Sequence, residues 1–448
     1  MITEYQIKNF KCFADTGTVQ LGAITVLLGR NNSGKSSLIQ PLQMLAQTLA
    51  ADDSTIQLAT HEPHDFGGYF EWVHRGQVNR DFSCSFTIDQ VTLASVSRTS
   101  QREKPRRYRL SLGLTFSLRR QVESQWLYLQ RFKLKLDPLQ ESGEPMAWVI
   151  QLNHRRKPVA ATFNNERIDV SGLEMINCLP ATLKWDKPVS PFVSDYAVIL
   201  PPHYFYSMDR PVRDALDMAM VEPMRPAIPR VLRSNERSPR SGGSTTHILA
   251  GLLRARTRRL KEWAEFQHYI NRWFGSVAEC FTGFDIEVVD ESRELFALVG
   301  KDCTTGARVN LADMGFGIAQ AFPIFVRLFY SWEGQIIVIE EPELHLNPAA
   351  QGMIFDAVVE YATQGRQIIV ETHSEHFVLR MRRRSLEQPE LRGLIRVHYV
   401  ERHDNQSVLT PLPLTEEGRL DNWPMGFLNE AFAESVELLK QLDKREAE

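Results

Sequence analysis

The sequence lacks any apolar run of about eighteen residues, the length that a transmembrane helix requires. Its N-terminus also lacks the charged and apolar stretches of a secretory signal peptide. Both absences argue against a membrane-spanning or exported protein. We therefore expect a cytoplasmic protein that has no membrane partner.

Cysteine is scarce and scattered along the chain. The five cysteines lie far apart and form no C-x-x-C pair: Cys12, Cys84, Cys178, Cys280 and Cys303. A structural zinc site or a disulfide framework is therefore not expected, and the thiols suit a reducing compartment. Internal repeats and long heptad runs are absent too, which excludes a long coiled coil.

The 448 residues, 43% hydrophobic and 24% charged, indicate a globular protein of more than one lobe. The net charge of −3 hides two basic stretches. Residues 101–170 hold fourteen Lys/Arg against seven Asp/Glu, and residues 225–261 hold ten against one. Such patches favour a DNA or RNA partner. The alternatives are an ordinary solvated face, or a surface that docks the acidic residues 401–448.

The clearest positive signal is a phosphate-binding loop. Residues 29–36 read G-R-N-N-S-G-K-S and follow an apolar run, Ile24 to Leu28, that predicts a strand. A helix is predicted to begin near Gly34. In this context, backbone N–H groups and the helix N-terminus hold phosphates. The predicted nucleotide contacts are Gly29, Arg30, Asn31, Asn32, Ser33, Gly34, Lys35, Ser36 and Ser37.

Two residues of this loop carry specific roles in triphosphate binding. Lys35 is expected to reach the β- and γ-phosphates, and the Ser36 hydroxyl is expected to hold Mg²⁺. The alternative is a chance glycine-rich turn before a core helix. Because the strand, the loop and the helix are all present, the sequence favours ATP with Mg²⁺ as cofactors.

A second strand is predicted from Gln335 to Ile339, and it ends in two acids, Glu340 and Glu341. Ligands of open α/β sheets bind at this end of the strands. We assign Glu340 to the metal and Glu341 to the base that polarises the attacking water. The alternative is a strand that ends in solvated acids.

A third strand, Gln367 to Glu371, is followed by Thr372, His373 and Ser374. Since parallel strands end at the same edge of the sheet, His373 is expected near the γ-phosphate, where it would sense that group. The alternative is a structural or surface histidine.

Together, G-R-N-N-S-G-K-S, I-E-E-P-E-L-H-L-N-P and E-T-H-S resemble the ATPase head of ABC-class proteins, in the RecF, SMC and OLD-like branch. The opening residues Ile2 to Phe13 are also typical of that branch. Tyr206 to Pro211 and Gly418 to Phe427 resemble stand-alone AAA/ABC ATPases of prokaryotic anti-phage systems, the PtuA- and AriA-like group. The resemblance covers residues 1–75 and 300–400 best.

The resemblance implies further nucleotide contacts made across a dimer of heads. Asn347 falls at the D-loop position, which crosses to the other protomer. Residues 311–317 are the best match to the signature element, with Asp313, Gly315 and Gly317 as candidate contacts. The usual signature serine is replaced by Asp313, so we expect Asp313 to cap the following helix. Asp65 to Gly68 is the nearest match to the Q-loop.

The resemblance and the patterns together predict an α/β fold: an ABC-type P-loop head with insertions. The head is expected to comprise residues 1–80 and 301–400. Residues 81–200 alternate polar and apolar positions, which indicates an inserted antiparallel β lobe. Residues 201–300 are predicted to form a mainly helical lobe. Residues 401–448 are predicted as an acidic tail with a helix from Ala431 to Lys444.

OLD-type proteins carry a nuclease domain with an Asp-x-Asp pair, and this chain has no Asp-x-Asp. We therefore expect an ATPase without a nuclease centre of its own. The leading hypothesis is an ATP-gated dimer or higher oligomer in an anti-phage complex, which regulates a separate effector protein such as a nuclease. The alternatives are a RecF-type repair ATPase that binds DNA directly and a slow-turnover scaffold that sequesters an effector. A transporter motor fits poorly, because about 300 residues separate Ser37 from Glu340.

Overall fold

The computed structural model describes residues 1–50, 69–93, 106–120, 125–139, 145–153, 155, 157–168, 173–176, 179–183, 212, 214–234, 245–424 and 427. Three predicted segments lie outside these residues: Asp65 to Gly68, Tyr206 to Pro211 and the tail helix Ala431 to Lys444. Within the described part of the chain, no helix is long and apolar enough to span a bilayer.

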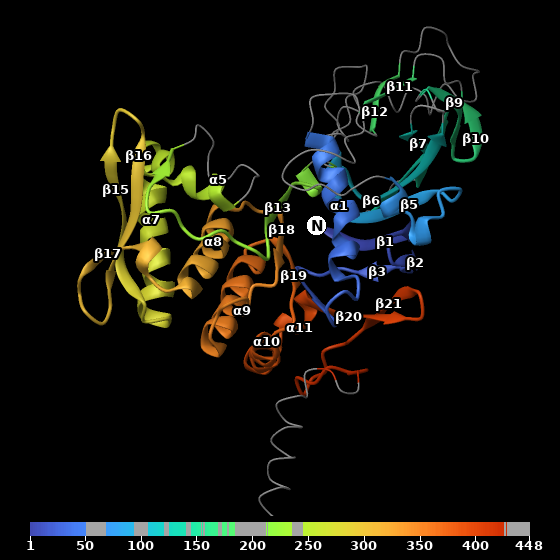
Figure 1. The fold of residues 1–448 in the computed structure, drawn as a ribbon. Helices are drawn as coiled ribbons and strands as arrows, with labels where there is room; N and C mark the ends of the chain where they lie inside the picture. Colours follow the sequence, from blue (N-terminus) through green and yellow to red (C-terminus); the bar gives the residue numbers. More distant parts are fainter. Residues whose placement is uncertain are drawn as a thin grey trace, which may run out of the picture.

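A six-stranded sheet forms the centre of the molecule (Figure 1). Its strand order is β13 (Met218–Val221), β18 (Ile336–Glu340), β19 (Gln367–Glu371), β4 (Ile24–Leu28), β20 (Ile395–His403) and β21 (Gln406–Pro411). The first five strands are parallel, and β21 runs antiparallel to β20. All five residues of β4 and of β19 are buried, as expected for a sheet covered on both faces.

Alternate residues of these strands enter two different hydrophobic cores. On one face, Leu27, Val338 and Ile369 pack with helix α1 (Lys35–Ala50). On the other face, Val26, Ile339 and neighbours pack with three helices, α8 (Phe316–Tyr330), α9 (Pro348–Ala362) and α10 (Glu375–Glu387). The central sheet is therefore the middle layer of the head, and the short helix α11 (Leu391–Leu394) leads into β20.

Nine strands form a second, antiparallel sheet that lies beyond α1 (Figure 1). They are β1 (Ile2–Phe10), β2 (Phe13–Asp15), β3 (Val19–Gln20), β5 (Phe82–Leu93), β6 (Arg106–Arg120), β7 (Gln125–Pro138), β8 (Met146–Leu152), β9 (Pro158–Phe163) and β10 (Glu166–Ile168). A short α2 (Tyr69–Trp72) and η1 (His74–Gly76) precede β5, and β11 (Leu173–Ile176) pairs with β12 (Leu179–Leu183). Because β1 pairs with β5, the sheet crosses the predicted boundary near residue 80.

The remaining elements lie at the opposite end of the molecule from β7 (Figure 1). They are three helices, α5 (Thr245–Ala250), α6 (Leu252–Arg258) and α7 (Leu260–Ile270), the π-helix η2 (Asn271–Val277), and the strands β14 (Leu232–Arg233), β15 (Phe281–Asp290), β16 (Leu295–Asp302) and β17 (Arg308–Asn310). An aromatic cluster joins them to α8, with Phe284 of β15 and Phe322 of α8 at 5.2 Å between ring centroids.

The prediction of a mainly helical lobe over residues 201–300 was wrong for its last part, because β15 and β16 form a hairpin there. The helices α5, α6, α7 and η2 cover residues 245–277, and the helical part ends there. Phe284 and Ile286 are buried while Glu287 is exposed, and this alternation is the signal of a strand. In contrast, the predicted α/β P-loop head with an antiparallel insertion is confirmed, without a long coiled coil among the described helices.

Candidate nucleotide-binding site

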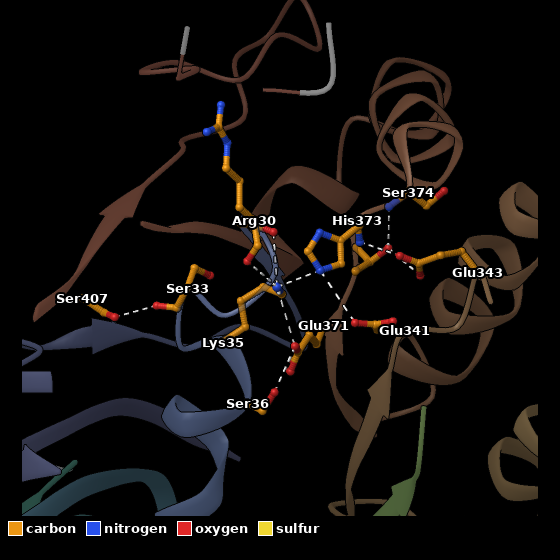
Figure 2. A network of polar contacts seen from close by, with 12 residues as sticks. Arg30, Ser33, Lys35, Ser36, Glu341, Glu343, Glu371, His373, Ser374 and Ser407 are labelled. Carbon is orange, nitrogen blue, oxygen red and sulfur yellow. Dashed lines mark hydrogen bonds and ion pairs between the residues drawn. The ribbon is translucent and has the colours of Figure 1, made fainter. Parts of the chain in front are cut away.

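Three strand ends place the predicted site residues side by side. Glu340 of β18 lies in register with Glu371 of β19, and Glu371 lies in register with Leu27 of β4. The phosphate loop begins directly after β4, at Gly29, and α1 begins at Lys35 as predicted. The predicted groups therefore converge on one edge of the central sheet (Figure 2).

The loop conformation requires glycine at two positions. Gly29 and Gly34 have φ angles of 152° and 107°, which side chains rarely adopt. A Cβ at Gly29 would lie 2.2 Å from the Val400 carbonyl oxygen, and one at Gly34 would lie 2.4 Å from Cys12 Sγ. Ser407 of β21, which the sequence analysis missed, donates a hydrogen bond to the Ser33 carbonyl at 2.5 Å. The loop is therefore held from the β20–β21 side as well as by its own turn.

Lys35 is buried, and its ammonium group is fully engaged. Nζ donates to the carbonyl oxygens of Gly29 at 3.2 Å and Arg30 at 3.1 Å, and to His373 Nε2 at 2.8 Å. Burial lowers the pKa of Lys35, and the charges of Glu371, Glu341 and Glu343 oppose that shift. An ammonium has three donor hydrogens, so each one has an acceptor within the protein.

His373 links the phosphate loop to Glu341, the residue that follows β18. Its Nε2 accepts from Lys35, because a lysine can only donate, and the ring therefore carries its proton on Nδ1. The same nitrogen lies 3.7 Å from Glu341 Oε1. Burial and then the Lys35 charge lower the pKa of His373 to about 4, so the ring is neutral at pH 7.

Glu340 and Glu341 have different environments. Burial, and next the charge of Glu371, raise the pKa of Glu340 to about 7. Glu341 is about a third exposed, and its backbone, at a φ of 43°, donates from N to the Glu371 carbonyl at 2.8 Å. A partly exposed carboxylate beside His373 has the access to water that a base needs, whereas the half-buried Glu340, beside the charge of Glu371, suits a cation.

Three functional residues were missed by the sequence analysis. Glu371 accepts from Ser36 Oγ at 3.0 Å, and Glu343 accepts from the His373 backbone N at 2.5 Å and from Thr372 Oγ1 at 2.8 Å. Arg225 is buried and donates to the carbonyl oxygens of Glu340 and Glu341 at 3.4 and 3.3 Å. Glu343 and Glu371 belong to the motifs I-E-E-P-E-L-H-L-N-P and E-T-H-S, so their positions in these motifs could have identified them as site residues.

The basic stretch 225–261 is partly used inside the protein. Arg225 supports the two acids, and burial lowers its pKa to about 10. Arg230 pairs with Asp313, Arg256 donates to the Ile286 carbonyl at 2.7 Å, and Arg259 pairs with Glu262 at 3.0 Å. The sequence count therefore overstates the charge that is free for a nucleic acid.

The predicted cap at Asp313 was wrong. Asp313 lies in the short helix η3 (Leu311–Asp313), and both of its oxygens accept from Arg230, at 2.5 and 3.0 Å. Gly315 occupies the N-cap of α8, and no side chain caps that helix. The turn at Met314 and Gly315 separates Asp313 from the helix start, so the carboxylate turns to the nearby guanidinium instead.

Gly317 and Asn347 lie close together in the chain's own fold. A Cβ at Gly317 would lie 3.2 Å from the His345 carbonyl, two residues before Asn347. The Asn347 side chain accepts from the Ala350 backbone N at 2.8 Å and so caps α9. The predicted contact of these residues with a second protomer's nucleotide stays a prediction.

The charges of the site fit a divalent cation. Four carboxylates, Glu340, Glu341, Glu343 and Glu371, face two cationic side chains, Lys35 and Arg225. Among the described residues, no group of three or more His, Cys, Asp or Glu side chains is arranged to hold a metal by itself. Magnesium in triphosphate sites is typically held by one or two carboxylates together with phosphates and water. Ser36 and Glu340 supply such a partial set.

Comparison with known families agrees with this geometry. Residues 1–99 and 254–378, half of the chain, match the family described as AAA ATPase domain. The chain belongs to this family. It is thus a P-loop ATPase, whose family uses ATP, typically with Mg²⁺. A second match of this AAA ATPase, over residues 395–438, is to a family described as Protein of unknown function (DUF3696).

Three solved structures share distant similarity with the AAA ATPase. An Smc head bound to the C-winged helix domain of ScpA is 10% identical, with 93% of this chain and 98% of that chain covered at a TM-score of 0.41. The SMC head domain from Thermotoga maritima is 11% identical, with 92% and 98% covered at 0.36. An Smc head with an extended coiled coil, bound to a ScpA domain derived from Pyrococcus furiosus, is 10% identical, with 99% of both chains covered at 0.37. No curated protein matches the chain.

Proposed function

We propose that this AAA ATPase hydrolyses ATP at Glu341 and uses the nucleotide cycle as a switch of self-association. The carrying observation is a chain of two contacts through His373. Its Nε2 lies 2.8 Å from Lys35 Nζ and 3.7 Å from Glu341 Oε1. Lys35 would bind the β- and γ-phosphates, and Glu341 would take a proton from the attacking water. Mg²⁺ held by Ser36 and Glu340 would neutralise charge on the phosphate oxygens.

The switch follows from the hydrogen-bonding capacity of Lys35 and His373. To contact a phosphate, Lys35 must give up at least one of its three present acceptors. His373 Nε2 accepts from Lys35, so it must release Lys35 and gain a proton before Nε2 can donate to a γ-phosphate. The Lys35 contact and a donation from Nε2 to a phosphate are therefore mutually exclusive, which would give the site two states.

Steady-state ATP hydrolysis by the purified chain tests this function, with and without double-stranded DNA. We expect Glu341→Gln to retain ATP binding, to lose turnover, and to elute as a larger species when ATP is present. We expect Lys35→Ala to lose ATP binding. Glu265→Gln, an exposed carboxylate on α7, is the matched control. Hydrolysis at the wild-type rate by Glu341→Gln would show that another residue is the base.

The second candidate function is a slow-turnover scaffold that binds ATP and sequesters an effector. The observation in its favour is Asp313, which stands where the resemblance places a serine and is ion-paired with Arg230 within the chain. A carboxylate that pairs with the Arg230 guanidinium does not offer the hydroxyl that a partner's phosphate would use. Bound ATP with negligible turnover, insensitive to DNA, would favour the scaffold over the switch.

The biological setting that we propose is an anti-phage complex with a separate effector, such as a nuclease. It rests on the resemblance of Tyr206 to Pro211 and of Gly418 to Phe427 to stand-alone defence ATPases. A RecF-type role in repair is the alternative. ATP turnover that rises with double-stranded DNA alone would favour repair, whereas turnover that changes only with a co-purified partner protein would favour the effector complex.

A further inference from the structure

Glu371 is a buried carboxylate that the proposed reaction does not yet use. It is the last residue of β19 and only 5% exposed, between the phosphate-loop strand β4 and the two-carboxylate strand β18. Burying a charged group is costly unless another group compensates for the charge. Its position therefore needs an explanation beyond filling the sheet.

The direction of the side chain follows from the alternation along the strands. Ile369 of β19 and Val338 of β18 enter the core on the α1 face, and each is two residues before an acid. Since side chains alternate along a strand, Glu371 and Glu340 point to that same face. This is also the face on which α1 presents Ser36, whose hydroxyl donates to Glu371 Oε1 at 3.0 Å (Figure 2).

The two oxygens of Glu371 differ in their partners. Oε1 accepts from Ser36 and lies 3.8 Å from Lys35 Nζ. Oε2 is buried, and among the described residues it has no hydrogen-bond partner. A buried carboxylate oxygen without a donor costs free energy, and such an atom marks the place of an ion or a water.

Glu371 thus brings a carboxylate oxygen without a hydrogen-bond donor beside Ser36, and its strand position is in register with Glu340. Lys35 is the nearby cation, yet its three donor hydrogens are directed to Gly29, Arg30 and His373. Arg225 donates instead to the backbone carbonyl oxygens of Glu340 and Glu341. Neither cation satisfies Oε2, whereas a divalent cation at Ser36 would.

We propose that Glu371 is a further ligand of the nucleotide-associated divalent cation, directly or through one water, together with Ser36 and Glu340. This inference rests on the proposed function, because it places the cation where Mg²⁺ accompanies ATP. It gives the ion two carboxylates, the buried Glu371 and the half-buried Glu340, while Glu341 remains free to act as the base. A ligand on the strand beside the phosphate loop also ties cation binding to the position of His373, two residues later.

The test is Mn²⁺ binding to the full chain, measured by electron paramagnetic resonance with the non-hydrolysable analogue adenylyl imidodiphosphate present. Glu371→Gln keeps an acceptor for Ser36 and removes the charge. We expect it to weaken Mn²⁺ affinity by at least about tenfold. Binding of the analogue in EDTA should be unchanged or tighter, because a negative charge near the phosphates is removed.

Glu401→Gln is the matched control. Glu401 lies near the C-terminal end of β20, as Glu371 does in β19, but it pairs with His403 at 2.7 Å. We expect it to leave Mn²⁺ affinity unchanged. Glu371→Asp keeps the charge on a shorter side chain and should restore part of the affinity. Thermal unfolding without ligands checks that each variant is folded, and Glu371→Asp serves as the test if Glu371→Gln does not fold.

The outcomes separate this inference from the function on which it rests. If Glu371→Gln binds Mn²⁺ as the wild type does, Glu371 is not a ligand, although the ATPase proposal stands. If metal-free binding of the analogue falls as much as Mn²⁺ binding, Glu371 only positions Ser36 and Lys35. If the wild-type chain binds neither the analogue nor Mn²⁺, both proposals are wrong.

Discussion

At the scale of single residues, the contact between Lys35 and His373 decides how the site responds to nucleotide. The two side chains come from positions 338 residues apart and meet at 2.8 Å. A neutral histidine beside a buried lysine can release it to a phosphate without breaking an ion pair. This contact is therefore suited to being exchanged in each catalytic cycle rather than to stabilising the fold.

Replacing His373 with Ala should separate turnover from binding. We expect kcat to fall by roughly 100-fold, the usual loss when one donor to a transition-state oxyanion is removed. The affinity for Mg-ATP should stay within a few-fold of wild type. Lys35 keeps its charge, and His373 no longer competes with the phosphate for the Lys35 ammonium group. Steady-state kinetics and titration with a fluorescent ATP analogue measure the two quantities. A parallel collapse of binding would show that His373 builds the loop instead.

A second histidine, His398 on β20, should make stability depend on pH. Burial lowers its pKa below the ordinary value of 6.5, although its hydrogen bond to the Gln20 carbonyl, 2.7 Å from Nε2, opposes the shift. The unfolded chain therefore takes up this proton first, and stability is lost as pH falls below 6.5.

His398→Gln keeps an N–H for the Gln20 carbonyl and cannot titrate. We expect its melting temperature to fall less than that of wild type between pH 7.5 and pH 5.5. His373 has a lowered pKa too, so the variant should remove only part of the pH dependence. If the melting temperature falls equally in both proteins, groups other than His398 cause the whole pH dependence of stability.

At the scale of elements, the start of α9 allows its capping role to be told apart from a contact with a partner. Asn347→Ala removes the side-chain cap on the Ala350 N–H and should cost about 1 kcal/mol in the free energy of unfolding. Asn347→Asp should keep the cap. If Asn347 also meets a partner's triphosphate, the new charge should weaken ATP-dependent association in the Glu341→Gln background.

Urea unfolding and light scattering measure these two effects. If Asn347→Asp associates as strongly as the Glu341→Gln protein without this change, Asn347 only caps α9 and does not contact a partner's nucleotide.

The elements that the sequence predicted best are those with uniform surroundings. β4, β18 and β19 are short apolar runs with polar ends, and a strand buried on both faces needs no more than that. The hairpin β15–β16 was missed because the exposed Val288 and Val289 of β15 blur the alternation of its buried and exposed residues. Asp313 was misplaced because a cap depends on the backbone angles of one residue.

The candidate site was predictable only as far as its motifs reach. Lys35, Glu341 and His373 could be named because each ends or follows a recognisable strand. The contact of Glu371 with Ser36 depends on β19 lying between β18 and β4, and no local pattern encodes that strand order. Arg225 was counted as surface charge, since burial of an arginine depends on what packs over it.

At the scale of the whole molecule, the solvent face of the large antiparallel sheet is the better candidate for DNA. Exposed Arg131 and Lys133 lie on the same side of β7, while the buried Phe132 faces the core. Replacing both with Ala should weaken binding to double-stranded DNA. It should also reduce the slope of log affinity against log salt by about 0.9 per removed charge.

Fluorescence anisotropy at several salt concentrations measures this change. The control replaces Arg293 and Lys301, near the hairpin at the other end of the molecule (Figure 1), and should leave the slope as it was. Identical slopes in both double variants would remove this face from the candidate surfaces.

The placement of β4 between β19 and β20 has a consequence for the newly made chain on the ribosome. Its two neighbours in the sheet, β19 and β20, follow this fully buried strand roughly 340 residues or more later in the sequence. At typical elongation rates, Ile24–Leu28 waits on the order of 20 to 70 s for them. During that time an apolar segment has neither neighbour, so we expect it to be open to a chaperone through most of the synthesis of the chain.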